Sequence, residues 1–440
     1  MKEMRIAAIC AALLASVASA ASPRTHNYDE SKVPPFTLPD ILTFSDGTKL
    51  KSPDEWPRRR REILRVFEKG MYGRMPPRPE TMEAVLLSST NSCAGYAERR
   101  VYRQYFREGR QGPFIDWTVF RPSHIKGKVP FVIALNSIGS FHIVHDPDLM
   151  PADGWLGDDP EMRRRRLEGA AKIRGAWADP NSRHHWPINA ILARGYAVVT
   201  ACYMDISPDP SKKEDRATQW RKRCFELWPP WDEAAPDNTK ALMAWAWGLC
   251  RGLDLVEAHE PTIDARRAVV TGCSRLGKAA LIAGAFDERF PVVVPNQTGN
   301  GGAPLAKRYF GENIYTESQS FPHWFTRSYF AYANREAELP FDQHWLLACV
   351  APRRLLVEGF DQPWFDTKGE YLACQAAGPV WEFLGLPGFP AKPFPPDYDT
   401  SCIGSHIGYV RRNLQHGLAA IDWKWMLDFA DRAFTAGAGK

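Results

Sequence analysis

The strongest indication of the fold is the segment Val269-Val270-Thr271-Gly272-Cys273-Ser274-Arg275-Leu276-Gly277-Lys278. A short apolar run ends at a serine, and a helix-forming run begins directly after it. A strand that turns into a helix in this way holds the serine in a strained, exposed conformation. Gly272 leaves room for the turn, and Gly277 allows the helix to pack close to the strand. The pattern predicts that Ser274 is a nucleophile; the alternative is a serine that caps an ordinary helix.

The residues after Ser274 predict how negative charge is stabilised. The backbone N–H that follows the serine points into the site at the positive end of a helix, where it can hold an oxyanion. The usual pattern at such a turn is Gly-x-Ser-x-Gly, but here Arg275 follows the serine and the second glycine comes one place later. Because a guanidinium is always charged, Arg275 can help to hold the tetrahedral oxyanion. A structural ion pair is its alternative role.

Strands and helices alternate around this turn. We expect short buried strands over 130–135, 196–201, 268–271, 291–294 and 355–357, and helices over 240–257, 275–286, 368–384 and 422–434. Strands separated by helices predict a mostly parallel central sheet that is covered on both faces. With the strand–serine–helix turn, this predicts an α/β-hydrolase fold, a three-layer αβα sandwich.

The amino-terminal fifty residues divide into two parts. Lys2 and Arg5 precede an apolar run of about twelve residues, and Ala18-Ser19-Ala20 follows as a small-residue cleavage site. Residues 1–20 therefore predict a signal peptide, too short to span a bilayer, and a secreted or periplasmic protein. Residues 21–50 are Pro-rich and polar, which is typical of an extended lead-in. We expect residues 51–440 to form a single catalytic domain.

The start of that domain shows a clear helix signal. Ser52-Pro53-Asp54-Glu55 is a capping box with proline at the first helical position, so a helix should begin there and run to about residue 69. Four consecutive arginines, Arg58–Arg61, lie on this helix. In a secreted protein we expect them to form a solvated face rather than a nucleic-acid site.

Composition excludes several classes of protein. The 440 residues are 44% hydrophobic and 24% charged, which is ordinary for a globular protein. A net charge of +5 is too small to predict nucleic-acid binding. Beyond the leader, no stretch reaches 18 consecutive apolar residues, so we expect no membrane partner. The cysteines show no metal-ligand spacing, so we expect no metal, and they allow zero to two disulfides.

A serine nucleophile needs a histidine to accept its proton. In α/β-hydrolases this histidine comes last in the chain, on a loop near the carboxyl terminus. His406 and His416 are the candidates by that criterion. His416 stands just before the terminal helix, whereas His406 lies in a stretch that favours a strand or its edge. His323 and His344 come earlier, and we interpret them as structural hydrogen-bonding residues.

At this point the sequence resembles the glucuronoyl esterases, carbohydrate esterase family 15. Residues 272–278 are similar to the family signature Gly-Cys-Ser-Arg-x-Gly-Lys. Further similar blocks follow in the family's order: Asn296–Ala303, Phe321–Phe325, Leu339–His344, Ala351–Arg353 and Ser405–Tyr409. The resemblance extends from about residue 60 to the end of the chain.

The resemblance implies roles for several residues. It selects His416 as the catalytic base, since the family histidine also precedes an Asp-Trp pair. It implies that Lys278 and Glu312 bind the hydroxyls of a uronate, and that Trp364 lines the sugar pocket. It favours the oxyanion role for Arg275.

The third catalytic residue is where the sequence departs from the family. The commoner family pattern has a glutamate just before the Gly-x-Gly-Gly-Ala block, but Gln297 occupies that position, and an amide cannot stabilise an imidazolium as a carboxylate does. Some family members take the acid from the loop after the next strand. Asp361 lies on that loop and is our expected acid, with Glu358 and Asp366 as alternatives.

Taken alone, the residues predict a secreted serine hydrolase. The resemblance implies an esterase that cleaves esters of (4-O-methyl-)glucuronic acid on xylan, including lignin–carbohydrate esters, through an acyl-enzyme. It implies no metal or organic cofactor, and we expect a monomer. Two alternatives remain open: another carbohydrate esterase, such as an acetyl esterase, and a catalytically impaired uronate-binding relative, which Gln297 suggests.

Overall fold

The computed structural model describes residues 26–232, 234–390 and 392–435. The predicted signal peptide therefore lies outside the described residues. Among the helices of the described part of the chain, none combines the length and the apolarity needed to cross a membrane.

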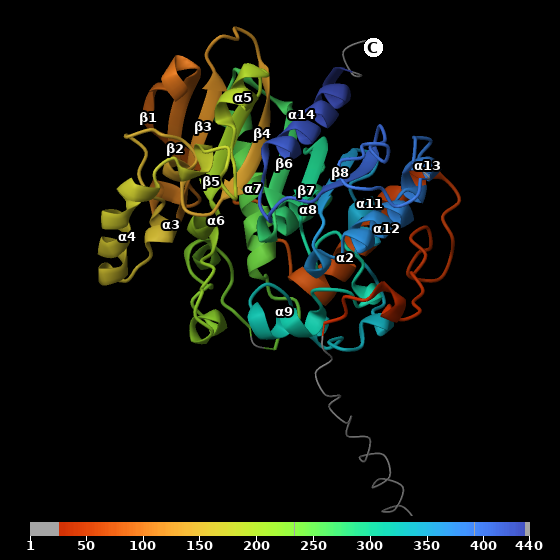
Figure 1. Ribbon diagram of the computed structural model, residues 1–440. Coiled ribbons are helices and arrows are strands. Elements are labelled where there is room, and N and C mark those ends of the chain that lie inside the picture. The colour runs from red at the N-terminus through yellow and green to blue at the C-terminus, as the bar shows by residue number, and fades with distance from the viewer. Residues whose placement is uncertain (1–25, 233, 391, 436–440) are drawn as a thin grey trace, which may run out of the picture.

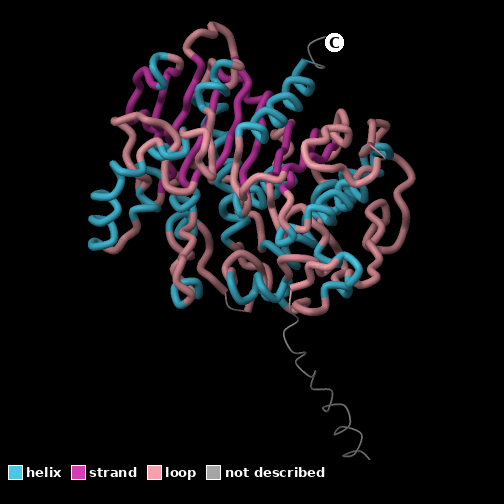
Figure 2. The backbone as a smooth tube through the Cα atoms, viewed as in Figure 1, coloured by secondary structure: helices cyan, strands magenta, loops and turns pink. Residues whose placement is uncertain are grey.

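One nine-stranded sheet organises the molecule (Figures 1 and 2). Its strands are β1 Glu83–Ser92, β2 Ala97–Tyr105, β3 Phe114–Pro122, β4 Val129–Asn136, β5 Ala197–Cys202, β6 Ile263–Cys273, β7 Val292–Asn296, β8 Arg354–Phe360 and β9 Ile407–Arg412. They are ordered β1-β2-β3-β5-β4-β6-β7-β8-β9 across the sheet. The pairs from β5 to β9 are parallel, and β1, β2 and β3 extend one edge as antiparallel strands. The mostly parallel sheet is confirmed, whereas the antiparallel extension was not predicted.

Helices cover both faces of this sheet. They are α2 Trp56–Phe67, α3 Asp153–Leu156, α4 Pro160–Ile173, α5 Ile188–Ala193, α6 Tyr203–Ile206, α7 Ala241–His259, α8 Arg275–Phe286, α9 Ile314–Ser320, α10 Arg327–Phe330, α11 His344–Ala348, α12 Thr367–Ala377, α13 Pro379–Phe383 and α14 Ala420–Thr435. Successive residues of β4 point to opposite faces, so Phe131 and Ile133 join one core and Val132 joins the other. The first core includes α2, α7, α8, α11 and α12, and the second includes α5 and α14 (Figure 1).

Two local expectations differ from the structure. The single helix expected over 368–384 is two helices, because Pro379 cannot continue α12 and instead opens α13. On α2, Arg59 and Arg60 are buried rather than solvated. Arg60 donates from Nε to the Cys349 carbonyl at 2.8 Å, and Arg59 donates to the Ile41 carbonyl at 3.1 Å. Both guanidiniums join α2 to segments that are distant in the sequence.

The lead-in also contributes to the core. Ile41, Phe44 and Leu50 are buried against α2 and its neighbours. The capping box at Ser52 and Glu55 is present, as predicted. The eight cysteines within the described residues are all free thiols.

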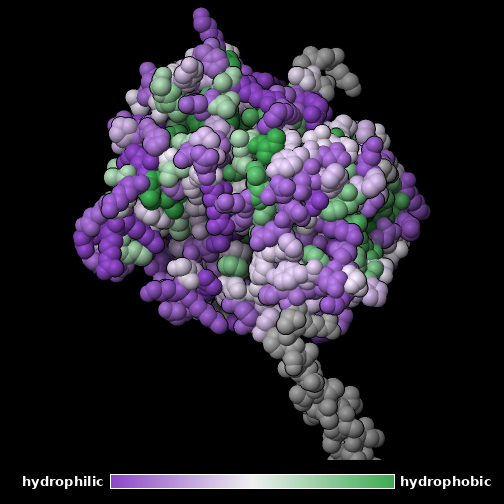
Figure 3. All heavy atoms as spheres, viewed as in Figure 1, coloured by the Kyte–Doolittle hydropathy of each residue, from purple (hydrophilic) through white to green (hydrophobic). Residues whose placement is uncertain are grey.

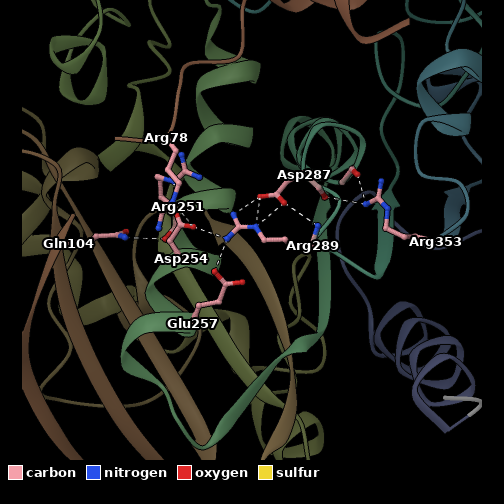
Figure 4. A network of polar contacts seen from close by, with 9 residues as sticks. Arg78, Gln104, Arg251, Asp254, Glu257, Asp287, Arg289 and Arg353 are labelled. Carbon is pink, nitrogen blue, oxygen red and sulfur yellow. Dashed lines mark hydrogen bonds and ion pairs between the residues drawn. The ribbon is translucent and has the colours of Figure 1, made fainter. Parts of the chain in front are cut away.

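A network of charges fixes α8 from its carboxyl end (Figure 4). Arg289 binds Asp287 at 2.6 Å, Asp254 of α7 at 2.8 Å and Glu257 of α7 at 2.7 Å. Arg353, just before β8, donates to the Gly284 carbonyl of α8 at 2.6 Å. Such a network resists movement of α8 relative to α7 and β8, and the opposite end of α8 carries Ser274.

The parallel strands end together at one edge of the sheet, which faces downward in Figure 1. There β5 leads into α6 and β6 leads into α8, and the longer loops gather beyond this edge (Figure 2). In open parallel sheets, binding and catalytic groups collect at this carboxyl edge. The outer surface in this view is mostly hydrophilic, with small hydrophobic areas (Figure 3).

Candidate active site

Ser274 occupies the turn between β6 and α8 that the sequence predicts. Its backbone has φ 60° and ψ −129°, a conformation that is costly for a residue with a side chain. The turn is tight, since a Cβ on Gly272 would lie 2.4 Å from the Leu276 carbonyl oxygen, and one on Gly277 would lie 2.7 Å from the Asn296 oxygen. The two glycines therefore permit the close approach that holds the serine in place.

His416 faces the same pocket as Ser274. Both residues line a cavity of about 360 Å³, which Trp177, Arg183 and His184 also line. Two phenylalanine rings hold the imidazole, since Phe360 and Phe365 have centroids 5.4 and 4.7 Å from it. Burial, with smaller contributions from the neighbouring His184, Arg183, Arg412 and Arg275, lowers the pKa of His416 to about 3. His416 is therefore a neutral imidazole at neutral pH.

Gln297 orients this imidazole. Its Oε1 lies 2.9 Å from His416 Nδ1 and accepts the Gly417 N–H at 2.9 Å, while its Nε2 donates to the Gly417 carbonyl at 2.9 Å. The Gly417 backbone thus fixes which end of the amide is oxygen. Because Oε1 can only accept, the proton of the neutral imidazole sits on Nδ1 and Nε2 keeps its lone pair. This is the tautomer that a general base requires.

The structure corrects the expectation that Asp361 orients His416. Asp361 follows β8 directly, and its side chain is half exposed and binds Arg411 of β9 at 3.1 Å. Its N–H continues the β8–β9 ladder to the Arg412 carbonyl, which directs the carboxylate away from the pocket. Gln297 is the residue that occupies Nδ1 of His416.

The two alternative acids are also engaged elsewhere. Glu358 is buried and accepts from Asn296 Nδ2 at 2.6 Å, and burial raises its pKa well above the usual range. Asp366 binds Arg308 at 2.9 Å and caps α12 by accepting the Gly369 N–H at 3.0 Å. Both carboxyls therefore have structural partners.

Arg275 lines the serine pocket, and its guanidinium forms an ion pair with Asp209. Asp209 also binds His323 Nε2 at 2.7 Å and accepts from Trp324 Nε1 at 3.3 Å. Burial alone would raise the pKa of Asp209, but Arg275 and His323 hold it below its usual range. The ion pair and a role toward the pocket are compatible, since Arg275 pairs with Asp209 and also lines the cavity that Ser274 lines.

The other predicted histidines lie outside the pocket. His406 stands before β9, at the opposite edge of the sheet from the serine turn, and its Nδ1 pairs with Ser405 Oγ at 3.0 Å. His344 bonds the Pro39 carbonyl at 3.1 Å, and His323 bonds Asp209. His323 and His344 thus make the structural hydrogen bonds expected of them.

Hydrogen bonds link Lys278, Glu312 and Trp364, and none of the three is among the residues that line the Ser274 pocket. Lys278 Nζ is buried, 3.0 Å from Glu317 Oε1 and 3.5 Å from Glu312 Oε2. The Glu312 N–H donates to the Trp364 carbonyl at 2.8 Å. Burial and the neighbouring Glu312 raise the pKa of Glu317. In this group the ammonium of Lys278 contacts the carboxyls of Glu312 and Glu317, and all three side chains are buried.

Comparisons with known proteins place the chain in a family. Residues 188–385 match the family model described as "Glucuronyl esterase, fungi". The chain is 34% identical to carbohydrate esterase MZ0003 from an unknown prokaryotic organism, over 95% of this chain and 94% of that protein. The chain belongs to the glucuronoyl esterases, carbohydrate esterase family 15.

Solved structures agree with this assignment. A glucuronoyl esterase from Solibacter usitatus superposes with a TM-score of 0.80 at 32% identity, covering 92% of this chain and 100% of that one. The 4-O-methyl-glucuronoyl methylesterase of Podospora anserina is 27% identical over 79% of this chain and 60% of that protein. The protein is therefore an α/β-hydrolase and a carboxylic ester hydrolase.

Sequence reasoning missed several residues of this glucuronoyl esterase site. Trp177 lies on the three-residue 3-10 helix Ala176–Ala178, and Arg183 and His184 lie in the loop after it, so no helical or strand periodicity marked them as pocket residues. Glu317 carries a weak signal only, because a glutamate on a short helix is usually exposed. Gln297 stood at the family's acid position, and that position was itself the signal that it contacts His416.

Proposed function

We propose that this glucuronoyl esterase hydrolyses esters of (4-O-methyl-)glucuronic acid carried on xylan, including esters to lignin alcohols. Ser274 is the nucleophile, His416 the general base and Gln297 the residue that orients it. The supporting observation is the hydrogen bond between Gln297 Oε1 and His416 Nδ1 at the pocket that Ser274 lines. An amide in this position follows the logic of Cys-His-Asn sites, where a neutral side chain also orients the histidine.

The reaction proceeds in two steps. His416 Nε2 takes the proton from Ser274 Oγ as the oxygen attacks the uronate carbonyl, and it then gives that proton to the leaving alcohol. Water then attacks the glucuronoyl-enzyme, with His416 again as the base, and the free uronic acid is released. The alcohol departs through the pocket beside Trp177 and His184.

In this mechanism a charged side chain stabilises the oxyanion, whereas no charged side chain stabilises the imidazolium. The Arg275 backbone N–H, at the start of the twelve-residue helix α8, and the Arg275 guanidinium face the developing oxyanion. The imidazolium that forms on His416 has a carboxamide beside it instead of a carboxylate. We therefore expect a working enzyme whose chemical step is slower than that of a carboxylate-assisted relative.

Lys278, Glu312 and Trp364 are proposed to bind the sugar. The proximity of Lys278 to Glu312 and Glu317 provides paired donors and acceptors for a hydroxyl-rich ring. Polar groups of a ligand must all find partners when they leave water, which such paired charges supply.

Hydrolysis of benzyl glucuronate tests this function. Wild type and Ser274→Ala are assayed beside an acetyl ester of a xyloside. Turnover of the glucuronate that exceeds that of the acetyl ester, and that Ser274→Ala abolishes, supports the proposal. Turnover of the acetyl ester alone contradicts the proposed substrate.

Gln297 also favours a second candidate, a relative that binds uronates without turnover. In that case neither ester is hydrolysed, and glucuronate binds the folded protein in a calorimetric titration. We further propose secretion after removal of residues 1–20, for which amino-terminal sequencing of the exported protein should begin at Ala21.

A further inference from the structure

The segment that opens the described chain is fixed against the proposed sugar-binding group. Asn27 accepts the Gly311 N–H at 2.8 Å, and the next residue, Glu312, donates to the Trp364 carbonyl at 2.8 Å. Glu30 binds Arg308 at 2.8 Å and Lys368 at 2.7 Å. Residues 26–30 are thus held at several points along the turn that carries Glu312.

Aromatic rings continue outward from Trp364 along this segment. The His26 ring centroid lies 5.0 Å from that of Trp364, and His26 Nε2 bonds Thr316 Oγ1 at 2.7 Å. Tyr28 stacks with His26 at 6.0 Å, with only 19° between the ring planes. Tyr28 is 51% exposed, which leaves much of a large aromatic side chain uncovered.

A hollow accompanies these rings. A cavity of about 660 Å³ is lined by His26, Asn27, Tyr28, Asp29 and Tyr309, among others. Aromatic rings beside amide and carboxylate groups suit a sugar, whose C–H faces pack on the rings while its hydroxyls find hydrogen-bond partners. Lys32 also lines the cavity but pairs with Asp29 at 3.2 Å, which favours a neutral ring over a second uronate.

We propose that residues 26–34 form a subsite for the neutral sugar chain that carries the uronate, with His26 and Tyr28 as its stacking surface. This inference rests on the proposed function. A uronate whose carbonyl lies at Ser274 and whose hydroxyls face Glu312 reaches toward Trp364. The sugar to which it is linked then continues over His26 and Tyr28. Because this segment is already held in place, binding orders little additional chain.

A comparison of two ester substrates distinguishes an effect on binding at this subsite from an effect on ester hydrolysis itself. One is benzyl glucuronate, and the other is the same ester linked through its anomeric carbon to xylotriose. Steady-state kinetics compare wild type with His26→Ala and Tyr28→Ala. Tyr96→Ala is the matched control, because Tyr96 is 57% exposed and lies on the β1–β2 connection.

We expect Tyr28→Ala and His26→Ala to raise KM for the xylotriose-linked ester roughly fivefold, about the effect of one aromatic contact. KM for benzyl glucuronate should remain within about twofold, and Tyr96→Ala should change neither value. Equal changes for both esters would overturn the proposal and show that the segment only supports Trp364. No change of KM for either ester would show that the sugar chain binds elsewhere, and this result would also overturn the proposal.

The subsite can be tested separately if the proposed function is wrong. If wild type hydrolyses neither ester, binding of unesterified glucuronoxylotriose is titrated instead. Weaker binding to Tyr28→Ala than to Tyr96→Ala would still support the subsite, and equal binding would refute it.

Discussion

The carboxamide oxygen of Gln297 lies 2.9 Å from Nδ1 of His416, in the place where a serine esterase usually has a carboxylate. The Gly417 N–H and carbonyl hold both ends of the amide, so its oxygen faces the imidazole. Geometry and tautomer are therefore correct for catalysis, and only the negative charge is absent.

Supplying that charge should accelerate the reaction. In Gln297→Glu, the carboxylate stabilises the imidazolium of the transition state, and we expect kcat on benzyl glucuronate to rise roughly tenfold or more. Arg412, which also donates to the Gly417 carbonyl, offsets repulsion between that oxygen and the new carboxylate. In Gln297→Leu, loss of the acceptor should lower kcat by about two orders of magnitude. A slower Gln297→Glu enzyme would contradict the interpretation that only charge is missing.

Removing the charge of Asp361 should have little effect on activity. Its carboxylate is half exposed and binds Arg411, so Asp361→Asn should leave kcat/KM within about twofold. The measurement is steady-state hydrolysis of benzyl glucuronate beside Ser274→Ala. A fall of several orders of magnitude would instead identify Asp361 as the catalytic acid.

The pH profile should lack an acid limb in the usual range. The free enzyme needs neutral His416, and a pKa lowered to about 3 means that protonation removes activity only as the pH falls toward that value. We expect log kcat/KM to stay flat from about pH 8 down to about pH 5. In Gln297→Glu the new carboxylate raises the pKa of His416, so the acid limb moves to higher pH. An inflection near pH 6.5 in wild type would disagree with a buried, neutral His416.

Lys278 should matter for stability as well as for binding. Lys278→Met leaves Glu312 and Glu317 buried without their cation, which should lower the free energy of unfolding by about 3–5 kcal/mol. The control is Lys424→Met, because Lys424 pairs with Asp428 at 2.6 Å on the exposed face of α14 and should cost about 0.5 kcal/mol or less. Urea denaturation measures both. Equal losses in the two variants would show that burial adds nothing to the Lys278 interactions.

Local patterns in the sequence determined much of this protein. The strand–serine–helix turn at Ser274 depends on glycines beside the serine and on an apolar run before it, and these are contiguous in the chain. The short parallel strands and α7, α8 and α14 were predicted for the same reason, since burial imposes its pattern on each segment separately. The antiparallel strands β1–β3 were not predicted, because their burial alternates irregularly. Their polar residues also pair with one another, as Arg103 does with Asp116 at 2.8 Å.

Which side chains meet at the site depends on packing between segments that are far apart in the chain. Gln297 and His416 are far apart in the sequence and meet because β7 and the loop after β9 end at the same edge of the sheet. Asp361 also lies near that edge, yet its place beside β9 turns its carboxylate to Arg411. Spacing in the chain could place both residues at this edge, but the direction of a side chain depends on the pairing of neighbouring strands. The sequence determined the nucleophile and its turn, and packing between distant segments decided its partner.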